Sequence, residues 1–335
     1  MRELDPGYFA VVMATGILAT ACRSLGLTPL FWLFLAIGLI AYLALIGLNA
    51  VRFVHHRSAL AEDIDRPERV FGFFAFVAGS NVLAATFLQV RFEIPAYILG
   101  AIGVGTWLVL TYVIPLRLIV SFGQESSQEF LANWLLWVVA TQSVAVVFAE
   151  ASALGRGPAP AFATIGLMIW GIGIVLYGVL ICFVMSRLLL AQLTPAQLTP
   201  PYWINMGAAA ISVLAGSLLL HLGTQDQLLN QVRPFVAGFS LTLWAWASWW
   251  IPALALLGLW RHWLRSVPLN YVPAFWSMIF PLGMYAAASV ELGRSIDQAW
   301  LVTLARLWLP VALLAWLWTF VAMLLSWRRP SELGL

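Results

Sequence analysis

Ten long apolar segments follow one another along this 335-residue chain, separated only by short polar breaks. About 20 apolar residues in a helix suffice to cross the hydrocarbon core of a bilayer, which is ~30 Å thick. The segments are 7–25, 29–53, 71–90, 94–121, 130–150, 159–187, 202–222, 233–262, 271–290 and 299–326. Because 62% of the residues are hydrophobic and only 9% are charged, no soluble domain fits between them. The sequence predicts an all-α integral membrane protein of ten transmembrane helices, forming a single polytopic domain over residues 1–335.

The distribution of arginine predicts the orientation in the membrane. An even number of spans places both termini on one side, together with the loops 54–70, 122–129, 188–201 and 263–270. Eleven arginines lie on that side (Arg2, Arg52, Arg57, Arg66, Arg69, Arg117, Arg187, Arg261, Arg265, Arg328 and Arg329) and five on the other (Arg23, Arg91, Arg156, Arg233 and Arg294). Since positive charge favours the cytoplasmic side, we expect a multi-pass protein of the plasma membrane (a bacterial inner membrane) with both termini in the cytoplasm.

Two kinds of span alternate along the chain. The odd-numbered spans carry small or polar residues near their centres: Thr15 and Gly16, Ser80 and Asn81, Thr141 with Gln142 and Ser143, and Ser212. The even-numbered spans are richer in tryptophan, and three share a late proline, Pro115, Pro252 and Pro310. Such a repeat of roughly 60 to 70 residues suggests five tandem helical hairpins in a ring. The small and polar residues would then line a central pore, although residues of these types also permit close helix packing.

A proline interrupts the ninth span in the stretch FWSMIFPLG. Pro281 has no N–H to donate, and its ring crowds the carbonyl four residues earlier, so we expect the helix to bend between Met278 and Phe280. Broken helices are tolerated in membranes where they are buried in protein or line a water-filled cavity. Phe280 is therefore either a packed core aromatic or a hydrophobic constriction of the pore.

Two stretches carry a family resemblance, PGYFAVVMATGIL (6–18) and AFWSMIFPLGMYAAAS (274–289). With the ten spans, they make the chain similar to the tellurite-resistance and C4-dicarboxylate transporter (TehA-like) family, which includes the slow-type anion channels of plant guard cells. The resemblance implies five hairpins in quasi-five-fold order, a central pore lined by the odd helices, and a homotrimer with one pore per protomer. It also implies an aromatic plug on the ninth helix, which by position is Phe280, next to Pro281.

The residues of the odd spans favour anions as the permeating species. None of these spans carries Asp or Glu at its centre, and Glu150 and Glu291 fall at the predicted extracellular ends. Hydroxyl and amide groups at the centres could donate hydrogen bonds to a partly dehydrated anion. We therefore expect a channel for small monovalent anions such as chloride and nitrate, gated by Phe280. The alternative is a secondary transporter, with or without proton coupling, for C4-dicarboxylates, sulfite or tellurite-type oxyanions.

Other functional classes find little support in the sequence. An intramembrane enzyme would need clustered acids or a nucleophile with its base inside the bilayer, and no such cluster is visible. The four histidines lack metal-ligand spacing. The expected partners are thus inorganic or small organic anions and the lipid bilayer, with no cofactor, no metal and no nucleic acid.

Overall fold

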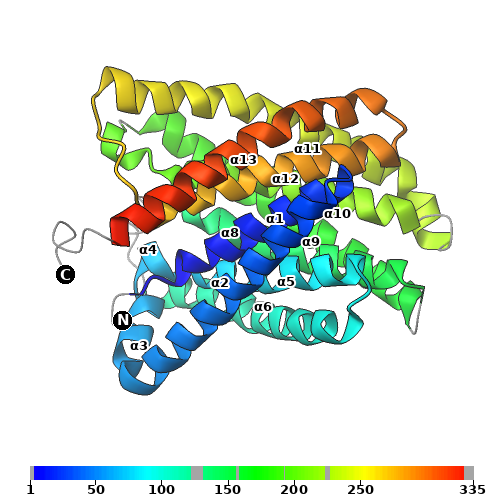
Figure 1. Ribbon diagram of the computed structural model, residues 1–335, viewed down its shortest axis with the longest axis horizontal. Coiled ribbons are helices and arrows are strands. Elements are labelled where there is room, and N and C mark those ends of the chain that lie inside the picture. The colour runs from blue at the N-terminus through cyan, green and yellow to red at the C-terminus, as the bar shows by residue number, and fades with distance from the viewer. Residues whose placement is uncertain (1–3, 122–130, 156–157, 192, 223–226, 328–335) are drawn as a thin grey trace.

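The computed structural model describes residues 4–121, 131–155, 158–191, 193–222 and 227–327, and the helices cross the molecule side by side (Figure 1). Ten of them are long and apolar enough to span a membrane, as predicted. They are α1 (Ala10–Ser24), α2 (Thr28–His55), α5 (Phe73–Gln89), α6 (Glu93–Ser121), α8 (Leu131–Ala153), α9 (Ala159–Leu190), α10 (Ile204–Leu222), α11 (Gln227–Leu259), α12 (Trp276–Ser295) and α13 (Ala299–Trp327). The eighth span begins at Gln227 rather than at 233, because Pro234 lies inside α11 and not at its start.

Short helices flank the spans at the end where the chain begins. The 3-10 turns η1 (Pro6–Phe9), η4 (Pro200–Trp203) and η6 (Pro273–Phe275) lead directly into α1, α10 and α12. All three begin with proline, whose fixed φ suits the first turn of a helix and whose missing N–H would have no partner there. Two more short helices, α3 (Arg57–Ile64) and α4 (Pro67–Val70), connect α2 to α5.

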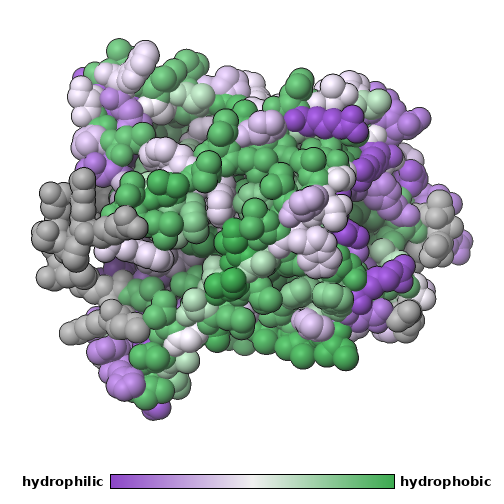
Figure 2. Space-filling view, viewed as in Figure 1, coloured by the Kyte–Doolittle hydropathy of each residue, from purple (hydrophilic) through white to green (hydrophobic). Residues whose placement is uncertain are grey.

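The ten spans divide into an inner and an outer set. In α1, α5, α8, α10 and α12, between 78% and 89% of the most apolar stretch is buried, compared with 22% to 33% in the five outer helices. This division follows the predicted alternation, because the outer helices expose leucine, isoleucine, valine and tryptophan. Figure 2 shows the result as a broad hydrophobic band across the middle of the molecule, with hydrophilic residues gathered toward its ends. Such a band matches the hydrocarbon core of a bilayer.

The inner helices contact one another in a closed cycle. Helix α1 packs on α5, α5 on α8, α8 on α10, α10 on α12, and α12 returns to α1. Each inner helix also packs closely on the outer helix that follows it, which makes five successive hairpins. The regular quasi-five-fold order of these hairpins stays a prediction, since contacts alone do not establish equal rotations.

A buried ion pair holds the connection between α2 and α5. The carboxylate of Asp63 on α3 lies 2.7 Å from Nη2 of Arg52 and 3.0 Å from Nη1 of Arg69. Arg52 and Asp63 are both fully buried. The second acid of this segment, Asp65, pairs instead with Arg117 of α6 at the surface. The connection is therefore fixed by one buried charge cluster and one exposed pair.

Candidate functional site

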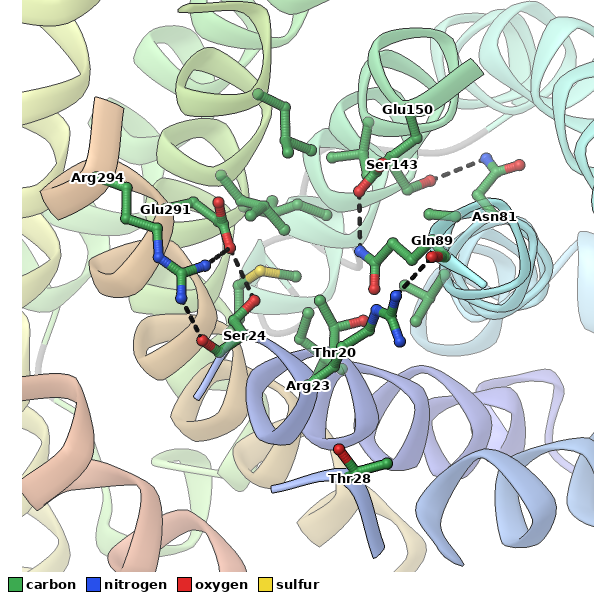
Figure 3. Close-up of a pocket in the computed structure, with 18 residues that line it drawn as sticks. Thr20, Arg23, Ser24, Thr28, Asn81, Gln89, Ser143, Glu150, Glu291 and Arg294 are labelled. Carbon is green, nitrogen blue, oxygen red and sulfur yellow. Dashed lines mark hydrogen bonds and ion pairs between the residues drawn. The ribbon is translucent and has the colours of Figure 1, made fainter. Parts of the chain in front are cut away.

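A cavity of about 480 Å³ lies between the inner helices (Figure 3), at the end of the bundle where α1 ends and α2 begins. All five inner helices contribute to its wall, each with residues spaced three, four or seven positions apart, which share one face of a helix. Examples are Asn81, Ala85 and Gln89 on α5, and Ser143 and Glu150 on α8. The wall is thus built from one face of each helix in the cycle.

Charged side chains surround the mouth of the cavity in two groups on opposite sides (Figure 3). In the first, Glu291 accepts a hydrogen bond of 2.7 Å from the Ser24 hydroxyl and lies 3.3 Å from Arg294. Its other oxygen lies 3.6 Å from Nε2 of His221. The carboxylate of Glu291 is therefore surrounded by groups that stabilise its negative charge.

The second group contains a less compensated carboxylate. Glu150 accepts a hydrogen bond of 2.8 Å from the side-chain amide of Gln89. Arg23 donates to the backbone carbonyl of Gln89 at 2.7 Å, and its guanidinium also lies over the ring of Phe31. No ion pair to Glu150 occurs among the residues that the structure describes. The two groups thus differ in how far neighbouring side chains compensate the charge of the carboxylate.

The inner part of the cavity is mostly apolar. Ile17, Ile211 and Met284 line it together with a single hydrogen-bonded pair, in which the Asn81 amide donates to the Ser143 hydroxyl at 3.0 Å. The Asn81 carbonyl oxygen has no partner within the described part of the chain. An ion in this part of the cavity would therefore meet few polar groups, among them one amide and one hydroxyl.

One helical turn beyond the innermost wall residues, each inner helix presents an apolar residue. These positions lie four residues before Ile17, Asn81, Ser143, Ile211 and Met284, on the same faces of their helices. They are Met13, Val77, Val139, Gly207 and Phe280, all buried, and we call them the closing layer. Phe280 thus lies on the cavity-facing side of α12, one turn from Met284.

Pro281 contacts the neighbouring inner helix at the same depth. A Cβ atom added at Gly207 of α10 would lie 2.7 Å from Cγ of Pro281, so only glycine allows the two helices to approach this closely. Helix α12 continues through Pro281 to Ser295 without interruption. The bend that the sequence predicts before Phe280 stays a prediction.

The structure brings two of the eight predicted pore residues, Asn81 and Ser143, into the cavity wall. The other six contact helices around them. Tryptophan N–H groups donate to the hydroxyls of Thr15 and Thr141 and to the carbonyl of Ser212. Ser80 shares a hydrogen bond with the Tyr42 hydroxyl, Gln142 donates to the carbonyl of Trp170, and Gly16 packs against Val82.

The sequence did not predict a site role for most of the polar residues at the mouth, namely Thr20, Arg23, Ser24, Gln89 and Arg294. A signal for some of them existed. Gln89 lies eight residues after Asn81, and Glu150 lies seven after Ser143, which is about two helical turns in each case. Projecting the helical face outward from Asn81 and Ser143 would have identified both. Within the described ranges, no group of three His, Cys, Asp or Glu side chains is arranged to hold a metal ion.

Comparison with known proteins gives a consistent family. The family model for SLAC1, the voltage-dependent anion channel, matches residues 3–324. An uncharacterized transporter of Methanocaldococcus jannaschii is 25% identical over 86% of this chain and 83% of its own length, and a second one is 22% identical over 86% and 84%. An uncharacterized membrane protein of Mycobacterium tuberculosis is 41% identical over 42% of this chain and 71% of its own length.

Proposed function

The chain belongs to the voltage-dependent anion channel (SLAC1) family of membrane channels and transporters, and from this membership we propose that it is a channel for small monovalent anions. Chloride and nitrate are the ions we expect it to conduct. The pathway runs through the cavity between the inner helices and is closed at rest by Phe280. The protein functions in the plasma membrane with both termini in the cytoplasm, so that the cavity opens to the outside.

One observation carries the proposal: a single cavity is lined by all five inner helices and ends one turn short of a layer of buried apolar residues. A narrow apolar segment excludes water and ions until it widens, which is how hydrophobic gates close a pore. Phe280 is the largest side chain of the closing layer and the only aromatic one. Movement of its ring is therefore the simplest way to connect the cavity with the opposite side.

Positive side chains at the mouth offset the helix dipoles that would repel an anion. All five inner helices end at the mouth, where the negative ends of their dipoles would repel an anion. Arg23 lies in the last turn of α1 and Arg294 in that of α12, and their positive charges offset this effect. Because the inner wall offers few polar groups, anions would bind weakly there and pass in order of their dehydration cost. Large, weakly hydrated ions such as nitrate would then pass more easily than fluoride.

A secondary transporter is the second candidate, favoured by one observation. Glu150 and Glu291 line the cavity, and a titratable group beside a translocation pathway is what proton coupling requires. Two of the relatives are also called transporters. In this case the substrate would be a C4-dicarboxylate, sulfite or a tellurite-type oxyanion. We further propose that either form assembles as a homotrimer in which each protomer has its own pathway.

The test compares chloride and nitrate currents of the wild-type protein with those of Phe280→Ala in planar bilayers. Loss of the ring should produce large ohmic currents that the wild type lacks. Phe74→Ala is the matched control, because Phe74 is equally buried on an inner helix but stacks on Trp137 and is not part of the closing layer. Absence of current from Phe280→Ala, together with substrate-dependent or proton-coupled flux in liposomes, would establish the transporter instead.

A further inference from the structure

A second cavity, of about 680 Å³, lies at the opposite end of the bundle, where α10 and α12 begin. It is formed by the last two turns of α11, the segment 265–272, the first turn of α12, the turn η4 and Trp318 of α13. No residue of this cavity belongs to the site described above. We propose that it binds an acyl chain with an anionic head group.

Two buried polar atoms indicate that the cavity is built for a ligand. Tyr202 is only 4% exposed, and its hydroxyl has no hydrogen-bond partner within the described ranges. Nε of Arg261 is also buried and has no hydrogen-bond partner within the described ranges, whereas Nη1 of the same side chain donates to the carbonyl of Leu198. Both residues line the cavity. Leaving a buried donor unsatisfied is costly, so a ligand that accepts from both atoms would remove this cost.

The positive charge of Arg261 indicates that the ligand is negatively charged. Among the residues that the structure describes, no acidic side chain lines the cavity. Of the other polar lining groups, His262 contacts the carbonyl of Val267 through Nδ1 at 2.8 Å. Arg261 and His262 lie in a π-helical turn, Trp260–Leu264, that ends α11. Such wide turns are rare and are often found at functional sites. A negatively charged head group would therefore lie against Arg261 and accept a hydrogen bond from Tyr202.

The remaining wall selects an acyl chain. Leu254, Leu257, Phe275, Met278 and Trp318 give the cavity a continuous apolar surface. Exposed hydrophobic residues, Leu259, Trp263 and Leu269, stand at its edge. By the arginine distribution, this end of the bundle faces the cytoplasm, where anionic lipids are abundant and basic pockets between transmembrane helices bind their head groups.

The position of the cavity gives the ligand a route to the gate. Phe275 closes the turn η6, and Met278 lies two residues before Phe280 on α12. A chain packed against both would stabilise the present position of the first turn of α12, and with it the closed position of Phe280. This regulatory part rests on the proposed channel function, whereas the binding site does not.

Binding is tested by native mass spectrometry of the delipidated protein with phosphatidylglycerol, with oleate and with phosphatidylcholine. We expect at least one of the two anionic probes to bind more tightly than the zwitterionic lipid. The comparison of phosphatidylglycerol with oleate shows whether the ligand is a phospholipid or a free fatty acid. Equal binding of all three probes, or no binding, would overturn the proposal.

Three variants locate the site. Tyr202→Phe removes only the unpartnered hydroxyl, so it should weaken binding about fivefold, as expected for one hydrogen bond, without lowering the melting temperature. Gly258→Phe should abolish binding, because Gly258 lines the cavity and has open space where a side chain would begin. Gly238→Phe on the same helix is the control, since its surroundings are equally open and it does not line the cavity. Unchanged affinity in both Tyr202→Phe and Gly258→Phe would exclude this location.

The regulatory effect is measured as anion flux in liposomes with and without the bound probe. The probe should lower the residual flux through the closed wild-type protein and leave the residual flux through Gly258→Phe unchanged. If the probe binds at this site but no variant conducts anions, the channel proposal fails and the binding site stands. If anions are conducted but no probe binds, the binding-site proposal fails and the channel proposal stands.

Discussion

The indole N–H of Trp316, on the last transmembrane helix, donates a 3.0 Å hydrogen bond to the hydroxyl of Thr15 on the first. Similar bonds join each of the other outer helices to the inner helix that follows it: Tyr42 to Ser80, Trp107 to Thr141, Trp170 to the carbonyl of Ser212, and Trp244 to Ser289. The pair of Trp316 and Thr15 completes this series across the two ends of the chain. It therefore fastens the last hairpin to the first.

Replacing Thr15 with valine should destabilise the bundle by about 1 kcal/mol, because hydrogen bonds between membrane helices contribute ~0.6 kcal/mol on average and up to ~1.7. Thermal unfolding in detergent measures the change. The double variant Thr15→Val with Trp316→Phe is the control, and it should lose less than the sum of the two single changes. Strict additivity would mean that the hydrogen bond contributes nothing.

Gly207→Ala should separate α10 from α12 beside the closing layer. The new methyl group would lie 2.7 Å from Cγ of Pro281, a rigid ring that cannot rotate away. We expect a loss of about 1–3 kcal/mol from overpacking and a measurable anion leak through the wild-type Phe280 gate. Gly47 lies on an outer helix with nothing within 4 Å of the added atom, so Gly47→Ala should change neither the stability nor the anion leak. An unchanged melting temperature and no leak in Gly207→Ala would contradict the close packing of the two helices.

Asp63→Asn should cost about 3–5 kcal/mol, because it removes the buried carboxylate that pairs with Arg52 and Arg69. The melting temperature and the yield of folded protein report the effect. Asp65→Asn is the matched control in the same segment, since the side chains of Asp65 and Arg117 are 64% and 46% exposed, and it should cost no more than about 1 kcal/mol. Similar losses of stability in both variants would show that burial of the Asp63–Arg52 pair does not determine its contribution to stability.

Glu150→Gln should increase anion current several-fold in the Phe280→Ala background. The change removes a carboxylate that has no ion-pair partner among the described residues, and ~1 kcal/mol of repulsion from its ionised form corresponds to about fivefold in ion occupancy. The increase should shrink in high salt, because ions screen the charge. Gln89→Glu adds a carboxylate beside it and should lower the current. An increase of the same size at all salt concentrations would indicate that the substitution changed the shape of the cavity rather than its charge.

Hydropathy predicted the ten spans, and the small or polar centres of the odd spans, with the tryptophan of the even spans, predicted the alternation of inner and outer helices. A buried helix in a membrane differs in composition from one that faces lipid, so the odd and even segments could be told apart. The family resemblance that PGYFAVVMATGIL and AFWSMIFPLGMYAAAS suggested is confirmed by the family match over residues 3–324.

The direction in which individual polar residues point could not be predicted in the same way. Thr15 and Ser143 occupy similar depths in their segments, yet Thr15 bonds to an outer helix and Ser143 lines the cavity. Each inner helix is buried all round, so no amphipathic pattern marks one face of it. Rotation about the helix axis is decided by partners far away in the sequence, such as Trp316, 301 residues from Thr15.

The composition of the closing layer also limits how an electric field can act on the protein. A water-filled cavity conducts, so the membrane potential would fall mainly across the part of the pathway that contains Met13, Val77, Val139, Gly207 and Phe280. A field performs work only on charge that moves, about 2.3 kcal/mol per elementary charge for 100 mV. None of these five residues carries a charge, so the voltage would have no gating charge to pull on there. Voltage would drive the current through an open pathway but leave the opening of this layer almost unaffected.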